Sequence, residues 1–253
     1  MIKDERLNKM EAYINAHQYV SVDELMEQFQ VSKATIRRDL DILGEQGVIC
    51  LLRGGAKKKG EVERELKYSE KLGRNREEKE RICRYASSMI KEGQTIFLDT
   101  GVTAREMIPF LAEMQSVHVV TNDILIATNL STNADIKVSV PGGDIRRGFY
   151  TIKGSETEQF LANLYVDIAF ISIDAIDLKF GCSITNNDEI VIKQQMISHS
   201  KKSVMIADHS KFESVASWKV CDLNSISLFV TGKELSYGIR GKYERQNVKI
   251  QIV

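Results

Sequence analysis

The stretch VSKATIRRDLDILGEQG, residues 31–47, determines the architecture of the N-terminal part of the chain. Ser32 is a good helix cap, and Val31 and Ile36 flank it at the spacing of a hydrophobic staple. Apolar residues then recur at helical spacing until Gly47, a residue typical of helix ends. The face expected to be buried holds Ile36, Leu40 and Leu43. The same helix carries two adjacent arginines, Arg37 and Arg38, on its opposite face.

The residues on either side complete a winged helix-turn-helix. Leu7, Met10 and Ile14 predict a first helix that ends near His17. The sequence SVDE at residues 21–24 has the form of a capping box and starts a short second helix, which a two-residue link joins to the third. A β-prone run at residues 48–52 leads into the glycine-tipped sequence Arg53-Gly54-Gly55-Ala56. Three short helices followed by such a ribbon predict a winged helix-turn-helix over residues 1–60.

The charge of this unit is uneven. Residues 1–30 hold three basic and six acidic side chains, whereas residues 31–60 hold seven basic and three acidic ones. The halves therefore carry net charges of −3 and +4, although the whole chain has a formal net charge of zero. A neutral total thus hides a basic face.

Two interpretations of the paired arginines remain open, a solvated basic stripe and a helix that reads DNA. In a helix-turn-helix, the second helix of the pair lies in the major groove, where arginine can bind guanine and hydroxyl groups can bind phosphate. The short link, the two caps and the basic ribbon favour the DNA reader. The residues expected to contact DNA are Ser32, Lys33, Ala34, Thr35, Arg37 and Arg38 of the helix and Arg53, Lys57 and Lys58 of the ribbon.

The rest of the chain predicts a connector and a larger α/β domain. Residues 61–81 are densely charged and are expected to form an exposed, partly helical connector. Over residues 82–253, β-type and helical segments alternate, which indicates a mostly parallel sheet with helices on both faces. The expected strands cover residues 95–98, 117–120, 136–140, 168–171, 203–207 and 226–230. The expected helices cover residues 102–114, with a kink at Pro109, and residues 124–130, 156–165 and 188–199.

Polar loops follow the carboxyl ends of these strands. Ligands of open α/β sheets bind at that edge, often with an anion at a helix N-terminus. A single loop such as DTGVT at residues 99–103 is more often a turn with a helix cap, but several such loops converge here. The residues expected to bind an effector are Asp99, Thr100, Gly101, Thr103, Thr121, Asn122, Gly142, Gly143, Arg146, Asp174, Glu189, Lys193, Asp208 and Lys211.

The pattern V-S-x-x-T-I-R-R-D-L-x-x-L-x-x-x-G, followed by GGA at residues 54–56, resembles the N-terminal signature of DeoR-family transcriptional regulators. The similarity extends over nearly the whole chain. It implies a C-terminal sensor domain that is related in fold to ribose-5-phosphate isomerase and CoA transferases and that binds phosphorylated sugars or sugar acids. Leu51 and Arg53 depart from the family's usual basic residue and histidine, and Val102 and Ala104 replace hydroxyl residues of its D-S-G-T-T-T motif.

Several classes of function are disfavoured. The four cysteines form no C-x-x-C pair and the four histidines show no metal-ligand spacing, so neither a metal nor a cofactor is expected. The charged N-terminus and the lack of a long apolar run predict a soluble, cytoplasmic protein.

We therefore expect a non-enzymatic transcriptional regulator, most simply a repressor of a carbohydrate or polyol catabolic operon that a phosphorylated intermediate releases from operator DNA. A homo-oligomer, dimer or tetramer, is expected because one small winged helix makes few base contacts. One alternative is a sugar-phosphate isomerase with an appended DNA-binding unit, in which Glu189 would be the general base and Asp174 and Lys193 its polar partners. Another is a C-terminal domain that only oligomerises. The plain interpretation of Glu189 and Lys193 is an i,i+4 surface pair.

Overall fold

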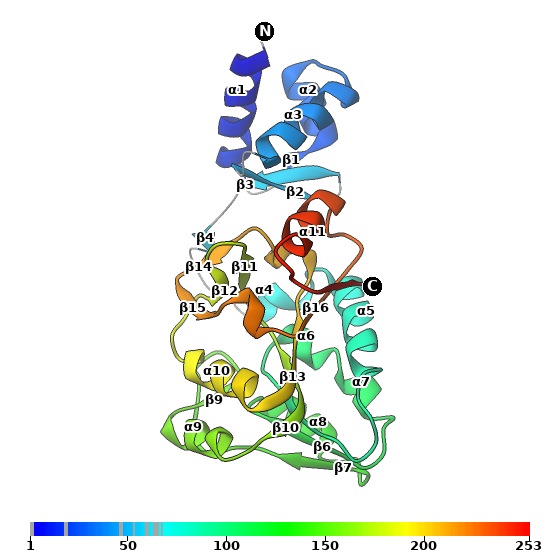
Figure 1. The fold of residues 1–253 in the computed structure, drawn as a ribbon, viewed down its shortest axis with the longest axis vertical. Coiled ribbons are helices and arrows are strands. Elements are labelled where there is room, and N and C mark those ends of the chain that lie inside the picture. The colour runs from blue at the N-terminus through cyan, green and yellow to red at the C-terminus, as the bar shows by residue number, and fades with distance from the viewer. Residues whose placement is uncertain are drawn as a thin grey trace.

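The chain folds into two units that lie end to end in an elongated molecule (Figure 1). The computed structural model describes residues 3–17, 20–45, 48–52, 54–58, 61–62, 66 and 68–253. The N-terminal unit contains three helices and a small sheet, and the C-terminal unit is a larger α/β domain. Among the described residues, no helix has both the length and the apolar character needed to cross a bilayer.

The predicted helices of the N-terminal unit are present. They are α1 (Lys3–Ala16), α2 (Val22–Phe29) and α3 (Lys33–Glu45). The capping box at the start of α2 is complete, because the Glu24 amide donates to Ser21 Oγ at 3.1 Å and the Ser21 amide donates to Glu24 Oε2 at 2.7 Å.

Helix α3 starts as its sequence predicts. The Thr35 amide donates to Ser32 Oγ at 3.3 Å. Val31 packs against the apolar cluster that contains Ile36, as a hydrophobic staple requires. The predicted stop at Gly47 lies outside the described residues. Since Ile36, Leu40 and Leu43 are buried against α1 and α2, the opposite face of α3 is turned to solvent.

Asp39 lies on the buried side of α3, where it forms an ion pair across the unit. Arg6 of α1 donates through Nε to Asp39 Oδ2 at 2.6 Å and through Nη2 to Oδ1 at 3.2 Å. The Asp39 side chain is 3% exposed. Its negative charge is thereby turned away from the surface that carries Arg37 and Arg38.

The predicted ribbon is formed by β2 (Ile49–Leu52) and β3 (Gly55–Lys58), which pair antiparallel. A short strand that the sequence analysis did not identify, β1 (Val20–Ser21), extends this sheet to the order β1-β3-β2. Arg53 and Lys59 lie outside the described residues, and so do the side chains of Lys57 and Lys58. The wing contacts expected for Arg53, Lys57 and Lys58 therefore stay predictions.

The C-terminal unit is built on one parallel sheet of seven strands in the order β17-β16-β13-β10-β5-β6-β7. Its strands are β5 (Thr95–Leu98), β6 (Val117–Thr121), β7 (Ile136–Ser139), β10 (Val166–Ile171), β13 (Ser200–Ile206), β16 (Leu228–Thr231) and β17 (Ile250–Ile252). The chain runs outward from β5 to β7 and then returns to β10 on the other side of β5. The order therefore reverses between β5 and β10, which is where ligands of open α/β sheets bind.

Helices cover both faces of this sheet, so alternate strand residues enter two separate cores. Ile96, Leu98 and Phe170 pack into one core, and Phe97 and Ala169 into the other. The first core is covered by α5 (Arg76–Ser87), α6 (Val102–Arg105), α7 (Ile108–Leu111) and α8 (Ile124–Leu130). The second is covered by α9 (Ser155–Ala162), α10 (Ile190–Ser198) and α11 (Tyr237–Glu244). The predicted α/β fold class is confirmed.

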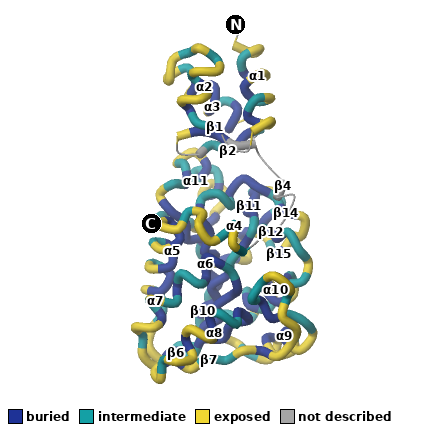
Figure 2. Tube along the Cα trace, turned by 180° about the vertical axis from the view of Figure 1, so that it is seen from behind, coloured by how far each residue is buried: buried dark blue, intermediate teal, exposed yellow. Residues whose placement is uncertain are grey.

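Smaller elements surround the sheet. They are β4 (Glu61–Val62), α4 (Tyr68–Leu72), β8 (Asp144–Ile145), β9 (Ile152–Lys153), β11 (Ala175–Asp177), β12 (Gly181–Ile184), η1 (His209–Lys211), β14 (Val215–Ala216), β15 (Trp218–Cys221) and η2 (Leu223–Ser225). Figure 2 shows the interior of both units in dark blue and their outer helices edged in yellow. The sequence analysis missed the short strands among them because two to four residues carry too little periodicity, whereas α4 lies in the connector that was predicted to be partly helical.

Two expectations were wrong. The helix predicted over residues 102–114 is split into α6 and α7, and Pro109 occupies the first turn of α7, where a missing N–H costs nothing. The charged connector is not exposed throughout, because Glu78 and Lys79 of α5 are each 3% exposed. The density of charged residues predicted that these side chains are exposed to solvent, whereas contacts with the rest of the domain bury both of them.

The Arg6–Asp39 pair gives a prediction for stability. Asp39→Ala leaves a largely buried guanidinium without its carboxylate and should lower the free energy of unfolding of the N-terminal unit by about 1 to 3 kcal/mol. Asp41→Ala, two residues along the same helix and exposed, is the matched control. Urea denaturation measures both, and equal effects of the two substitutions would contradict the role of the pair.

Candidate functional site

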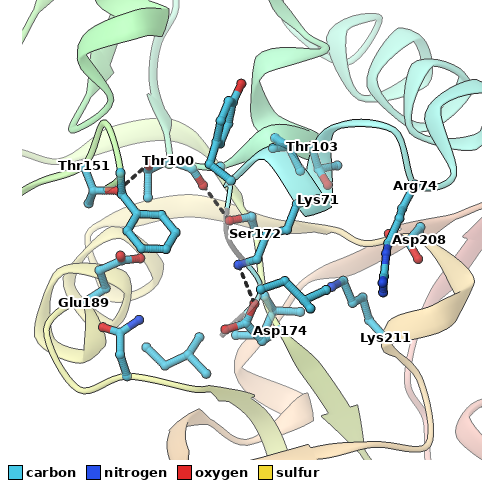
Figure 3. Close-up of a pocket in the computed structure, with 18 of the residues that line it drawn as sticks. Lys71, Arg74, Thr100, Thr103, Thr151, Ser172, Asp174, Glu189, Asp208 and Lys211 are labelled. Atoms are coloured by element: carbon cyan, nitrogen blue, oxygen red, sulfur yellow. Dashed lines mark hydrogen bonds and ion pairs between the residues drawn. The ribbon is translucent and has the colours of Figure 1, made fainter. Parts of the chain in front are cut away.

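A cavity of about 110 Å³ lies at the carboxyl ends of β5 and β10, at the point where the strand order reverses. Thr100, Gly101 and Thr103 line it after β5, and Ser172 and Asp174 line it after β10. Pockets for drug-sized ligands enclose roughly 300 to 1,000 Å³, so this cavity suits a small metabolite. Figure 3 shows the lining side chains converging from several loops and helices.

The floor of the cavity is organised by the ammonium group of Lys193. Its Nζ donates to Asp99 Oδ2 at 2.5 Å and to the Ser172 carbonyl at 3.3 Å, and it lies 3.5 Å from Glu189 Oε2. The Lys193 and Asp99 side chains are 3% and 0% exposed. Burial alone would lower the pKa of Lys193, but the carboxylates of Asp99 and Glu189 outweigh it and raise the pKa. Glu189 and Lys193 thus form an i,i+4 pair, but a buried one.

Gly101 allows this close packing. Its φ of 122° lies in a region that L-residues rarely adopt, and a Cβ at this position would lie 3.1 Å from Ser172 Oγ. Ser172 Oγ in turn donates to the Thr100 carbonyl at 2.6 Å. Gly101 is therefore needed to bring the loop after β5 against the loop after β10.

One wall of the cavity comes from the segment that joins the two units. It is lined by Lys71 of α4, by Arg74 in the turn between α4 and α5, and by Lys79 of α5. Lys71 Nζ donates to Asp174 Oδ1 at 3.2 Å, and Lys79 Nζ donates to the Lys71 carbonyl at 3.0 Å. Desolvation by burial lowers the pKa of Lys79. The predicted connector is thus part of the site.

A stacked arginine holds this wall in place. Arg105 of α6 lies over the rings of both Tyr68 and Tyr150, with its Cζ 4.2 Å and 4.5 Å from the two centroids, and the two rings contact each other edge to face at 5.3 Å. The guanidinium also donates to Asp123 Oδ2 through Nε at 3.1 Å and through Nη2 at 3.0 Å. Because Tyr68 belongs to α4, the stack fixes α4 to the body of the domain.

The cavity is predominantly cationic. Six basic side chains and three acidic ones line it among the described residues, namely Lys71, Arg74, Lys79, Arg146, Lys193 and Lys211 against Asp174, Glu189 and Asp208. Arg146 Nη1 donates to Glu189 Oε1 at 3.0 Å. Arg74 and Lys211 form no ion pair with any described residue. This excess of positive charge matches an anionic ligand.

The acidic residues of the cavity are held in their ionised form. Burial opposes ionisation of Asp174, but the positive charges of Lys71 and Lys211 and the hydrogen bonds from Thr185 lower its pKa well below the usual value. Burial likewise opposes ionisation of Asp208, and Lys211 together with a hydrogen bond from Ser210 lowers its pKa. Both carboxylates therefore act as hydrogen-bond acceptors.

The structure brings most of the predicted effector residues to this cavity. Those that line it are Thr100, Gly101, Thr103, Arg146, Asp174, Glu189, Lys193, Asp208 and Lys211. Asp99 lies directly beneath and is bound to Lys193. Thirteen further lining residues were not assigned from the sequence, among them Lys71, Arg74, Lys79, Phe149 and Ser172. Only the spacing of the basic residues in the connector could have suggested the first three.

Four predicted effector residues do not line the cavity. Thr121 and Asn122 are fully buried. Thr121 Oγ1 accepts from the Asp123 amide at 3.1 Å, and Asn122 Nδ2 donates to the Ile152 carbonyl of β9 at 3.4 Å. The Gly142 carbonyl accepts a hydrogen bond from Thr157 Oγ1 at 2.7 Å. Gly143 has a φ of 135°, and a Cβ there would lie 2.5 Å from the Lys153 carbonyl oxygen. In the structure these residues support the neighbouring loop.

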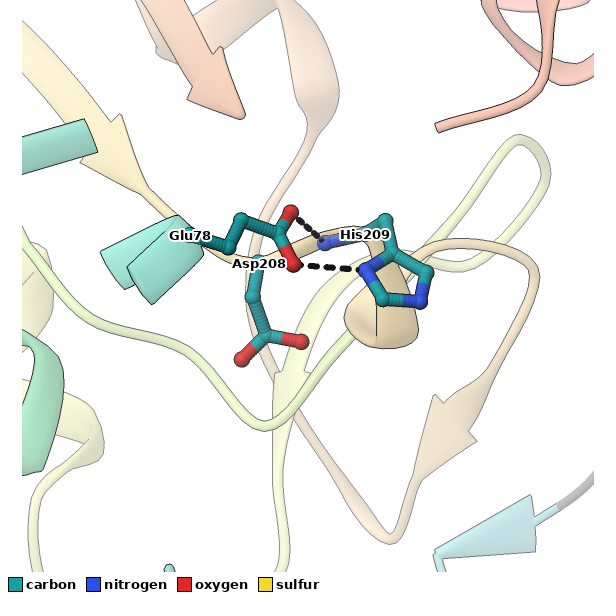
Figure 4. A group of neighbouring side chains, drawn as sticks. All are labelled: Glu78, Asp208 and His209. Atoms are coloured by element: carbon teal, nitrogen blue, oxygen red, sulfur yellow. Dashed lines mark hydrogen bonds and ion pairs between the residues drawn. The ribbon is translucent and has the colours of Figure 1, made fainter. Parts of the chain in front are cut away.

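A cluster of Glu78, Asp208 and His209 borders the cavity (Figure 4). Its ligand-type atoms lie within 4.8 Å of one another. Glu78 Oε2 is 2.6 Å from His209 Nδ1, and Glu78 Oε1 accepts from the His209 amide at 2.8 Å. Asp208 Oδ1 accepts from Asn75 at 2.9 Å and from the Ser210 amide at 3.0 Å. These bonds account for the proximity, so the cluster links α5 to η1.

The second candidate site is the outer face of α3. Ser32, Lys33, Ala34, Arg37 and Arg38 are exposed, and Thr35 is half-buried. Lys33 Nζ lies 3.4 Å from Asp23 Oδ1, and neither Arg37 nor Arg38 forms an ion pair with a described residue. The predicted base-reading residues thus occupy one solvent-facing surface.

A helix with this surface, on a winged unit joined to a domain with a charged cavity, defines a DNA-binding protein with a ligand-binding domain. Family models match both the N-terminal and the C-terminal unit. The DeoR-like helix-turn-helix domain matches residues 6–61, and the DeoR C terminal sensor domain matches residues 74–233. The chain belongs to the DeoR family of transcriptional regulators.

Curated relatives are similar over most of their length. The uncharacterized HTH-type transcriptional regulator YgbI of Escherichia coli is 30% identical over 92% of this chain and 91% of its own. The HTH-type transcriptional repressor GlcR of Bacillus subtilis is 29% identical over 100% and 97%. The glycerol-3-phosphate regulon repressor of E. coli is 31% identical over 90% and 89%.

Among solved structures, the ribose 5-phosphate isomerase from Plasmodium falciparum is similar at 17% identity, with a TM-score of 0.39, over 53% of this chain and 52% of its own.

The Glu78–His209 bond gives a pH prediction. Burial alone would lower the pKa of His209, but the hydrogen bond to Glu78 and its charge outweigh burial and raise the pKa. A raised pKa stabilises the fold below the unfolded value of about 6.5, and this stability is lost as pH rises through the folded pKa. The stability difference between wild type and His209→Asn should therefore be largest in acid and shrink with rising pH. Thermal unfolding across that range measures it, and a difference that grows with pH would contradict the assignment.

Proposed function

We propose that this protein represses a carbohydrate or polyol catabolic operon and that a phosphorylated sugar or sugar acid releases it from operator DNA. The observation that carries the proposal is the cationic cavity, one wall of which belongs to the segment between the two units. An anionic ligand bound there contacts that segment directly. We assign residues 1–60 to DNA binding, residues 61–81 to the connector and residues 82–253 to effector sensing.

The charges of the cavity suggest how such a ligand is oriented. Arg74, Asp208 and Lys211 gather on one side, while Glu189 and Thr151 lie on the other (Figure 3). A phosphoryl group carries between one and two negative charges near neutral pH and is best placed against Arg74 and Lys211, neither of which forms an ion pair with a described residue. The sugar hydroxyl groups then donate hydrogen bonds to the carboxylates of Asp174 and Glu189.

DNA recognition is assigned to the outer face of α3 together with the wing. Arg37 or Arg38 takes a bidentate position on guanine, and Ser32 and Thr35 bind phosphate. A dimer or tetramer places two such helices on repeated half-sites. The Arg53, Lys57 and Lys58 contacts of the wing belong to the same proposal.

The isomerase alternative is less well supported. In that reaction Glu189 would have to take a proton from the substrate, yet both of its carboxylate oxygens lie beside cations, Arg146 at 3.0 Å and Lys193 at 3.5 Å. Such a carboxylate is held as a structural anion. The cavity is therefore assigned to binding rather than to proton transfer, since relatedness in fold does not carry activity with it.

Operator binding in the presence of sugar phosphates tests the proposal. Fluorescence anisotropy on DNA from the gene's own promoter should show weaker binding with one member of a panel of glycerol 3-phosphate, ribose 5-phosphate, glucose 6-phosphate and fructose 6-phosphate. Lys211→Ala should weaken that response because it removes a cation that forms no ion pair with a described residue, and Lys249→Ala, an exposed lysine that does not line the cavity, is the control. An unchanged operator affinity with every compound would contradict the proposal, and turnover of any of them by the pure protein would favour the isomerase.

The arginines of α3 give a separate prediction. Arg37→Ala or Arg38→Ala should weaken binding to the specific operator by about 1 to 3 kcal/mol if that arginine contacts guanine. Arg84→Ala, an exposed arginine on α5, controls for the loss of charge alone. Anisotropy on specific and scrambled DNA separates base reading from phosphate binding. Equal losses on both DNAs would assign the residue to phosphate.

A further inference from the structure

One short segment, residues 208–216, touches both the effector cavity and the start of the connector, directly after the DNA-binding unit. Its first part, η1 with the preceding Asp208, lines the cavity through Asp208, Ser210 and Lys211. Its last part, β14, pairs in parallel with β4, the strand that follows the wing, in the register Val215 to Glu61 and Ala216 to Val62. The same nine residues therefore line the cavity at one end and pair with the start of the connector at the other.

The middle of this segment is anchored to α11. Phe212 is fully buried, with its ring 5.3 Å from that of Tyr243. The Glu213 amide donates to Tyr243 Oη at 3.4 Å, and that hydroxyl donates to the Ile176 carbonyl at 3.0 Å. Glu213 is 3% exposed and has a φ of 57°, in the left-handed region that is unfavourable for a residue with a side chain. A strained, buried residue of this kind is held by its surroundings and responds when they change.

Glu213 leads directly to the recognition helix. Its Oε2 lies 3.7 Å from Lys242 Nζ on α11. Lys242 Nζ donates to the Gly44 carbonyl in the last turn of α3 at 2.8 Å. Carbonyl groups of the last turn lack partners within the helix, and a cation there also interacts favourably with the helix dipole. Figure 1 shows α11 lying between the parallel sheet and the small sheet of the N-terminal unit.

We propose that residues 208–216 and Lys242 form a relay, in which Lys242 positions the C-terminal end of α3 according to what occupies the cavity. This inference rests on the proposed function and adds its route of regulation. A ligand shifts a conformational equilibrium only if it contacts the two states differently. Lys211 and Asp208 supply that difference, because they contact the ligand directly. Glu213, two residues after Lys211, carries the displacement to Lys242.

The first test removes the link and leaves the cavity intact. Lys242→Met keeps the length of the side chain but loses its charge and its donor, Lys242→Arg restores both, and Lys249→Met is an exposed control. With the panel compound that most weakens operator binding by wild type, the fold-change should fall from the roughly 5- to 150-fold range of allosteric coupling to about 1 in Lys242→Met. It should return in Lys242→Arg, while calorimetric affinity for that compound stays unchanged. A wild-type response in Lys242→Met would overturn the relay.

The second test needs no effector, so it separates failure of the relay from failure of the proposed function. Amide hydrogen exchange is measured over residues 40–45 in the ligand-free full chain. Lys211→Ala should change exchange there in the Lys242 background but not in the Lys242→Met background. Identical exchange in wild type and Lys211→Ala would overturn the relay even if sugar phosphates regulate DNA binding. If no panel compound alters operator binding but Lys211→Ala changes hydrogen exchange over residues 40–45 as expected, the relay is supported and the proposed effector class is wrong.

Discussion

The buried ammonium of Lys193 is the interaction on which the C-terminal unit depends most. It joins Asp99 at the end of β5, the Ser172 carbonyl at the end of β10 and Glu189 at the start of α10. A charge so deeply buried requires anions around it, and removing one partner of a buried pair costs about 3 to 5 kcal/mol. The point where the strand order reverses is therefore fixed by electrostatics as well as by strand pairing. The cavity opens directly above this point.

The second feature of the architecture is that its regulatory parts are shared between the two units. The connector contributes Lys71, Arg74 and Lys79 to the cavity, and the Arg105 stack with Tyr68 fixes α4 against the body of the domain. Helix α11 in turn reaches back to the end of α3 through Lys242. A ligand that neutralises the excess cations changes the balance of forces on the connector and on η1 together. The proposed regulation thus depends on the basic side chains that the connector and η1 contribute to the cavity.

Much of the fold was predictable from local sequence signals. The capping box at Ser21, the staple of Val31 with Ile36 and the alternating strands each leave a pattern within a few residues. The cavity was predictable only where a motif follows a strand, as for Thr100 and Asp174. Lys79 escaped prediction because a lysine in a charged run is usually solvated, and its burial depends on α5 packing against the sheet. Thr121 and Asn122 follow a strand as the lining residues do, but the next loop covers them.

The relay is a further property that no local pattern reveals. Glu213 and Lys242 are 29 positions apart in the sequence, and Gly44 lies nearly 200 positions before Lys242. Their meeting requires the C-terminal helix to fold back onto the N-terminal unit, which only the assembled structure establishes. Neither residue belongs to a motif that indicates function.

In the proposed mechanism, the cavity and the face of α3 that is proposed to read DNA are coupled energetically. Thermodynamic linkage requires the coupling to be reciprocal, so the most direct measurement is the calorimetric affinity of the sugar phosphate with and without saturating operator DNA. The account predicts that operator weakens sugar-phosphate binding by the same factor by which the sugar phosphate weakens operator binding. Equal sugar-phosphate affinities for free and DNA-bound protein would contradict it.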